Sequence, residues 1–247
     1  MAPDPDTLRE RLAAATCILF DLDGTLVDTV ELIMASARYA TEVVLGEALP
    51  DDVLKHDIGM PLKDQMERYA PGRSAELLAV YREHNAVVHD DLIREYPGVE
   101  EALQALVGTG YRLGVVTSKS RPVAWRGLDR FGLGNYFATL VGYEDTEIHK
   151  PRAEPVLEGA RRLGVSARSC LYVGDSPHDM AAGIASGAVS VAALWGPFPE
   201  RVLEPGPDVV LAEIGELAPL LQESRDARGH ECSELQESTR WRPPEGL

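Results

Sequence analysis

Two aspartates close a short apolar stretch near the start of the chain. Asp21 and Asp23 end the run CILFDLD. If this run is a β-strand, residues at positions i and i+2 point to the same side of it. Neighbouring carboxylates repel each other unless a cation or a shared proton offsets their charge, and Mg²⁺ accepts a few carboxylates while keeping places for water and phosphate. The pair therefore indicates a Mg²⁺ site, although a lone Asp-x-Asp is also common in surface loops.

A second pair of aspartates follows another apolar run, SCLYVGD. Asp175 closes this run, and Ser176 and Pro177 come next as a typical helix N-cap and first helical residue. Asp179 then lies in the first helical turn, where it could simply stabilise the helix dipole. If the two strands are neighbours, however, Asp175 becomes a third carboxylate for the same metal ion and Asp179 a fourth.

Hydroxyl groups and a lysine supply groups of the kind that hold phosphate. Thr117 and Ser118 close the run RLGVVTS, and their hydroxyls and the following backbone N–H groups suit phosphate oxygens. The alternative is that they only cap a helix. Lys150 stands among acidic residues, where lysines usually form solvated surface pairs. Beside a cluster of aspartates it would offset their charge and grip a phosphoryl group.

The elements that must position these residues alternate between strands and helices. Apolar residues at helical spacing lie between the β-branched runs, for example over 99–107 before Gly108 and Gly110. This alternation predicts an α/β fold, a doubly wound, Rossmann-like parallel sheet with helices on both faces. In such a sheet, ligands bind at the carboxyl ends of the strands. The strands are expected at 17–22, 112–118, 138–143, 169–175, 189–194 and 208–211.

One interval breaks the alternation, because residues 30–94 read as successive amphipathic helices without a strand. We expect an all-helical domain inserted after the first strand, although the helices could also pack directly on the sheet. The predicted divisions are the first part of the core over 1–28, the helical cap over 29–95, the second part of the core over 96–222, and a disordered tail over 223–247.

The composition excludes several classes of partner. The chain of 247 residues has a formal net charge of −16, which argues against binding nucleic acid or an anionic membrane by general electrostatics. Its three cysteines have no metal-like spacing and indicate reduced thiols. No stretch has the ~18 apolar residues of a membrane span. The residues before the first strand do not show a basic region followed by an apolar one, so a signal peptide is not expected. A cytoplasmic enzyme for a small anion is expected, and nothing in the sequence specifies an oligomeric state.

Four segments together resemble the motifs of the haloacid dehalogenase-like (HAD) phosphatase superfamily. They are FDLDGTLVDT (20–29), VVTSK (115–119), HKP (149–151) and GDSPHD (174–179), in that order and spacing. The resemblance covers about residues 17–211, and the helical insertion resembles the type of cap that closes over the site in this superfamily.

The resemblance implies a role for each matching residue. Asp21 would attack phosphorus, and Asp23 would act as general acid and then as base. Thr117 and Lys150 would orient the phosphoryl group, and Ser118 and Gly24 would contact the substrate. The Mg²⁺ ligands would be Asp21, the backbone carbonyl of Asp23 and Asp175, with Asp179 supporting the site.

The substrate is expected to be a small phosphate compound. Dehalogenases in the superfamily lack an aspartate at the position of Asp23, so its presence favours phosphoester or phosphoanhydride cleavage. The cap segments resemble those of HAD-type pyrophosphatases slightly more than those of phosphoglycolate phosphatases, and a phosphomutase or a noncatalytic phosphate-binding regulator are the alternatives.

Specificity is expected to lie in a turn of the cap, which could also be an ordinary interhelical loop. Lys63 would suit a second negative group of the substrate. His84, His89 and Asp90 are expected to be solvated helix positions. The candidates in the turn are His56, Gly59, Met60, Pro61, Leu62 and Lys63.

Overall fold

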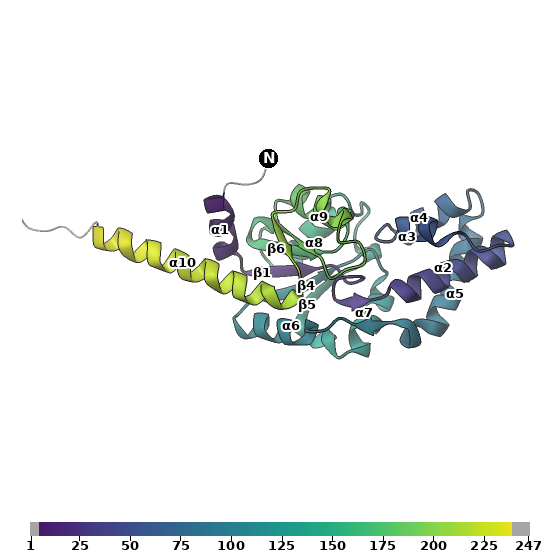
Figure 1. Ribbon diagram of the computed structural model, residues 1–247, viewed down its shortest axis with the longest axis horizontal. Helices are drawn as coiled ribbons and strands as arrows, with labels where there is room; N and C mark the ends of the chain where they lie inside the picture. The colour runs from purple at the N-terminus through teal and green to yellow at the C-terminus, as the bar shows by residue number, and fades with distance from the viewer. Residues whose placement is uncertain (1–4, 239–247) are drawn as a thin grey trace, which may run out of the picture.

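The core of the protein is a six-stranded parallel sheet with the strand order β5-β4-β1-β6-β7-β8. The computed structural model describes residues 5–238, and side chains within 7–227 (Figure 1). The chain order reverses on the two sides of β1, which lies between β4 and β6. Such a switch point leaves a crevice at the carboxyl ends of the strands. The predicted fold class is therefore confirmed.

All six predicted runs form strands, and most of the polar residues that were expected to close them lie just past the strand ends. The strands are β1 (Cys17–Phe20), β4 (Arg112–Val116), β5 (Phe137–Val141), β6 (Cys170–Gly174), β7 (Val189–Ala193) and β8 (Val209–Leu211). The flanking helices are α1 (Pro5–Ala14), α6 (Val99–Gly108), α7 (Arg121–Arg130), α8 (Glu154–Arg162), α9 (Pro177–Ser186) and α10 (Leu217–Ser238). Short 3₁₀ turns lie at Leu133–Tyr136, Tyr143–Asp145, Ala167–Ser169, Arg201–Leu203 and Ile214–Glu216.

Both faces of the sheet are covered, which explains why its strands are almost continuously apolar. Along β1, Ile18 and Phe20 pack into one hydrophobic cluster with residues of α1, α6, α7 and α10. Cys17 and Leu19 pack into a second cluster with residues of α8 and α9. The alternation within a single strand thus assigns the helices to two layers and fixes β1 at the centre of the core.

The segment between β1 and α6 forms a helical domain with a hydrophobic cluster of its own. Met34, Leu54, Met66 and Leu77 belong to this cluster, and each is at most 1% exposed. The helices therefore pack against one another through these residues, to one side of the sheet (Figure 1). They are α2 (Val30–Leu45), α3 (Asp51–His56), α4 (Leu62–Tyr69) and α5 (Ser74–Leu92).

A two-stranded antiparallel ribbon connects the helical domain to the core. Its strands are β2 (Val27–Asp28) and β3 (Arg94–Glu95), with Val27 opposite Glu95 and Asp28 opposite Arg94. The chain therefore leaves the core and returns to it at neighbouring points.

The expectation of disorder from residue 223 onward differs from the structure, because α10 continues to Ser238. Leu217, Leu221 and Ser224 lie one helical turn apart and are buried, and the Arg225 guanidinium lies 4.1 Å from the centre of the Tyr111 ring. The buried face of the helix thus extends past Leu221 to Ser224, and it docks the start of this segment on the core. Residues 239–247 lie outside the described part. Within residues 5–238, no helix has the length and apolar character to cross a membrane.

Candidate active site

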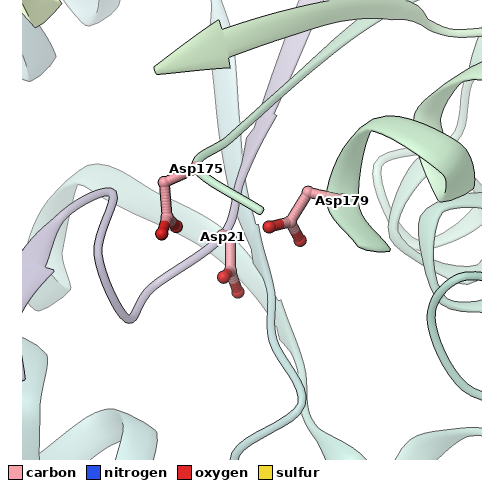
Figure 2. A group of neighbouring side chains, drawn as sticks. All are labelled: Asp21, Asp175 and Asp179. Atoms are coloured by element: carbon pink, nitrogen blue, oxygen red, sulfur yellow. The ribbon is translucent and has the colours of Figure 1, made fainter. Parts of the chain in front are cut away.

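The strand ends bring the predicted aspartates together at the carboxyl edge of the sheet. Asp21 follows the central strand, and its backbone N–H donates to the carbonyl of Val173 on β6 at 2.8 Å. Asp175 follows β6, and Asp179 lies in the first turn of α9. Figure 2 shows the three side chains next to one another, with Asp21 between Asp175 and Asp179. One oxygen of each lies within 4.8 Å of the others, and all three residues are buried.

Lys150 places its ammonium group among these carboxylates. Its Nζ lies 3.0 Å from Asp21 Oδ1 and 2.6 Å from Asp179 Oδ1, and the residue is 4% exposed. Burial by itself lowers the pKa of this lysine, but Asp179 and Asp21 outweigh burial, so its pKa is raised and it stays charged. The expectation of a lysine that offsets the aspartates therefore agrees with its position.

Asp179 is held by protein donors on both of its oxygens. Oδ1 accepts from Lys150 and from the phenol of Tyr172 at 2.9 Å, and Oδ2 accepts from the backbone N–H and hydroxyl of Ser176. Although burial acts to raise the pKa of Asp179, Lys150 and these hydrogen bonds lower it. Asp179 thus supports Lys150 and the start of α9, and its oxygens are already engaged.

The negative charges of Asp21 and Asp175 are offset less completely by neighbouring cations and hydrogen-bond donors. Burial, together with Asp179, raises the pKa of Asp21 to about 7 and the pKa of Asp175 well above its usual range. The ammonium of Lys150, 3.0 Å from Asp21 Oδ1, is shared with Asp179. Three buried carboxylates therefore face one ammonium, which leaves an excess of negative charge. This donor set of hard oxygens with excess negative charge fits a divalent cation such as Mg²⁺.

The side chain of Asp23 lies apart from the three clustered carboxylates. Its Oδ1 accepts from Thr29 Oγ1 at 2.7 Å and from Lys119 Nζ, and its side chain is 20% exposed. It also lines the cavity described below. This position suits proton transfer to a substrate, while metal binding by its backbone carbonyl stays a prediction.

Gly24 makes room for Asp175. Its φ is +84°, and a Cβ atom there would lie 2.3 Å from Asp175 Oδ2. The next residue, Thr25, donates its hydroxyl to Asp175 Oδ1 at 3.0 Å. Gly24 is not among the described residues that line the cavity, so its position accounts for the placing of Asp175, and a contact with the substrate stays a prediction.

A cavity of ≈ 590 Å³ lies between the sheet edge and the helical domain. Asp21, Thr117, Ser118 and Lys150 line it from the core, and Ser118 Oγ is buried in it without a hydrogen-bond partner. The cap turn reaches the cavity through some of the predicted candidates, namely Gly59, Met60, Leu62 and Lys63.

The other two candidates of the turn are placed differently. The side chain of His56 is 61% exposed, and its Nδ1 lies 2.8 Å from Asp57 Oδ1. Pro61 precedes α4 as its N-cap residue and is buried. Neither is among the described residues that line the cavity.

Several site residues were not predicted. Tyr81, Arg82 and Asn85 on α5 and Arg126 on α7 line the cavity, and Tyr172 holds Asp179 from within β6. The α5 residues carry a helical spacing that could have marked a common face. Tyr172 looks like an ordinary strand residue, and only its neighbour in space reveals its role.

The expectation that His89 is solvated is wrong. The residue is 1% exposed, and its Nδ1 lies 2.7 Å from Asp90 Oδ1. Asp90 is exposed and forms an ion pair at 3.0 Å with Arg126 of the core. Burial of His89 follows from the end of α5 folding back onto the core at the connecting ribbon.

The doubly wound sheet, the aspartate–lysine cluster at its carboxyl edge and the inserted helical domain define a hydrolase of the phosphatase type. A family model described as haloacid dehalogenase-like hydrolase matches residues 18–193. The chain belongs to this family, as its four motifs indicated.

Individual relatives agree with this assignment. The pyrophosphatase PpaX of Halalkalibacterium halodurans is 38% identical over 204 residues, which cover 81% of this chain and 94% of the relative. A solved structure of a predicted phosphoglycolate phosphatase from Haemophilus somnus 129PT has a TM-score of 0.78 at 23% identity and covers 84% of this chain and 98% of that one.

The β-phosphoglucomutase of Clostridium difficile has a TM-score of 0.74 at 16% identity, covering 87% of this chain and 99% of that one. The fold is thus shared by hydrolases and a mutase, and it does not by itself distinguish the two reactions.

Proposed function

We propose that the protein is a Mg²⁺-dependent phosphohydrolase that cleaves a small phosphate compound, with pyrophosphate favoured over a phosphoglycolate-like monoester. The observation that carries this proposal is the buried cluster of Asp21, Asp175, Asp179 and Lys150, which opens into a cavity beneath the helical domain. The relative named pyrophosphatase PpaX supports the preference for pyrophosphate.

In the proposed reaction Asp21 is the nucleophile. One of its carboxylate oxygens attacks phosphorus, the bond from phosphorus to the leaving-group oxygen breaks, and Asp23 gives its proton to that oxygen. Asp23 then takes a proton from a water molecule, which attacks the aspartyl-phosphate and regenerates Asp21. Covalent catalysis of this kind divides one difficult displacement into two easier ones.

The surrounding residues keep these two carboxylates in position. Lys150 offsets the charge of Asp21, which burial otherwise drives toward its neutral form. Lys119 and Thr29 hold the side chain of Asp23 at the cavity. Thr117 is 4% exposed and lines the cavity, where its hydroxyl can bind a phosphoryl oxygen.

Mg²⁺ would be held by Asp21, Asp175 and the backbone carbonyl of Asp23, with Asp179 behind them. When bound, the ion offsets the negative charge of nucleophile and phosphate and polarises the phosphoryl group.

The helical domain over residues 29–95 would act as a cap on the core formed by 1–28 and 96–222. Its contribution would be to exclude water from the cavity and to contact the leaving group. Gly59, Met60, Leu62 and Lys63 lie where such contacts can form.

Phosphate release with Mg²⁺ tests the proposal over pyrophosphate, phosphoglycolate and common sugar phosphates. The Asp21→Asn variant should lose at least about a thousandfold in turnover because it removes the nucleophile. Asp52→Asn is the matched control, since Asp52 is exposed on α3. Wild-type turnover by Asp21→Asn would contradict the covalent mechanism.

The same screen separates the alternatives. A phosphomutase would isomerise a sugar phosphate with little phosphate release. A noncatalytic regulator would neither isomerise nor hydrolyse any of these compounds.

A further inference from the structure

Helix α5 contributes one continuous face to the cavity. The lining residues Leu78, Tyr81, Arg82, Asn85 and Ala86 have the spacing i, i+3, i+4, i+7 and i+8, which places them along a single side of a helix. The lower and upper ends of this face are apolar, and its middle is polar. A ligand in the cavity can therefore contact Tyr81, Arg82 and Asn85 from the helical domain, in addition to the residues at the edge of the sheet.

The charge on this side of the cavity is opposite to the charge of the helical domain as a whole. Residues 30–92 contain 12 acidic residues and 6 Lys or Arg residues. Among the described residues of this segment, only Lys63 and Arg82 are charged and line the cavity, and both are cationic. The helical domain thus turns its acidic residues away from the cavity and two of its basic residues toward it.

Arg82, like Lys63, differs from the remaining cations of the cavity because it has no hydrogen-bond or ion-pair partner within the described residues. Lys150 pairs with Asp21 and Asp179, Lys119 pairs with Asp23, and Arg126 pairs with Asp90. Lys63 forms no hydrogen bond or ion pair in the described part of the chain. Within the described residues, no hydrogen bond or ion pair engages Arg82. Its guanidinium group is therefore available to an anion in the cavity.

The neighbours of Arg82 are held in place. The amide of Asn85 donates to Ser36 Oγ on α2 at 3.3 Å, and Tyr81 is 6% exposed. Helices α2 and α5 pack along each other through the cluster that contains Met34 and Leu77. Arg82 thus projects from a fixed helix surface, which reduces the cost of ordering it around a ligand.

We propose that Arg82 binds the leaving group of the substrate, and that this leaving group carries a negative charge of its own. The inference rests on the proposed function and narrows its substrate class. Asp21, Thr117 and Lys150 already account for the phosphoryl group that is transferred. The planar fork of a guanidinium group matches a second phosphate or a carboxylate with two parallel hydrogen bonds. Compounds with an uncharged leaving group lack this contact.

Steady-state kinetics of Arg82→Met, measured with three substrates in the presence of Mg²⁺, test the proposal. Pyrophosphate and phosphoglycolate carry the second anion as phosphate and as carboxylate, and p-nitrophenyl phosphate does not carry one. For the anionic compound that the wild type prefers, kcat/KM should fall about 10- to 100-fold, chiefly through KM, as expected for the loss of a charge-assisted hydrogen bond. This decrease in kcat/KM should be at least about tenfold larger than the decrease that the same variant shows with p-nitrophenyl phosphate. Arg82→Lys should recover part of it because the charge returns without the fork.

Arg73→Met is the matched control. Arg73 precedes the same helix, is exposed, pairs with Glu76 and does not line the cavity. It should retain wild-type kinetics on all three substrates. Comparison of the decrease in kcat/KM with pyrophosphate and with phosphoglycolate shows whether Arg82 binds a phosphate or a carboxylate.

The outcomes separate this inference from the function on which it rests. Equal losses for Arg82→Met on all three substrates, or kinetics like those of Arg73→Met, would overturn the role of Arg82 and leave the phosphohydrolase intact. Failure of the wild type to release phosphate from any of the three would overturn both. Thermal unfolding of each variant identifies a loss that comes from misfolding, and in that case Arg82→Lys, compared with the wild type on the same substrates, decides the question.

Discussion

Replacement of Lys150 by methionine should strongly destabilise the metal-free protein. Its Nζ lies 2.6 Å from Asp179 Oδ1 and 3.0 Å from Asp21 Oδ1, and it is the one cation among three buried carboxylates in the described site. Methionine keeps a similar length and apolar stem but removes the charge. The variant therefore tests the electrostatics of the cluster with little change in packing.

The size of the effect follows from these distances. At an effective dielectric constant of about 20, unit charges this far apart attract by about 5–6 kcal/mol each. The variant recovers part of this loss because the ammonium no longer has to be desolvated and because Asp21 can take up a proton. Removal of one partner from a buried ion pair typically costs about 3–5 kcal/mol, which is the expected loss in the free energy of unfolding.

Urea unfolding followed by circular dichroism, at pH 8 with a chelator, measures this loss. Lys55→Met is the control because Lys55 is exposed on α3, and it should change stability by less than about 0.5 kcal/mol. Addition of Mg²⁺ should stabilise Lys150→Met more than the wild type, since the ion replaces missing positive charge. If Lys150→Met and Lys55→Met unfold at the same urea concentration, the cluster does not depend on Lys150 for its compensation.

Three further predictions concern the metal site. Gly24→Ala should weaken Mg²⁺ binding at least about tenfold in calorimetry, because its Cβ would displace Asp175; Gly46→Ala shares the positive φ but has nothing within 4 Å, so an equal effect would contradict the explanation. Mg²⁺ binding near pH 7 should release protons and tighten from pH 6 to pH 8, because the raised pKa of Asp21, about 7, leaves that carboxyl partly protonated without metal; binding heats independent of the buffer would argue against this. Chelation should abolish phosphate release without loss of helical circular dichroism, because the cluster lies at strand ends and not within the apolar layers, and unfolding on chelation would identify a structural metal instead.

The sequence predicted the core of the site because parallel strands end at a common edge. Asp21, Thr117 and Asp175 each follow an apolar run, so an alternating strand and helix pattern was enough to bring them together. The long cap helices were predictable for a similar reason, since α2 has a sustained apolar period.

Features that depend on contacts between distant residues were not predictable in the same way. Helix α3 is short and buries only Leu54, so it has little apolar period to detect. His89 and Tyr172 acquire their environments from elements that are remote in sequence. Arg82 resembles any exposed helical arginine until the cavity and its lack of a partner are known.

Strands β2 and β3 pair as a β-hairpin does, so in the topology of the chain the entire cap is the loop of that hairpin. Asp28 and Arg94 are opposite each other, and paired residues of antiparallel strands have Cα atoms only about 4.5–5.5 Å apart. Residues 29–93 can therefore be lengthened, shortened or exchanged for the corresponding segment of a relative without moving the ends that anchor them. Such transplants would keep Asp21 and its neighbours on an unchanged sheet while replacing the surface that selects the leaving group, so that reactivity and selectivity can vary independently within one chain.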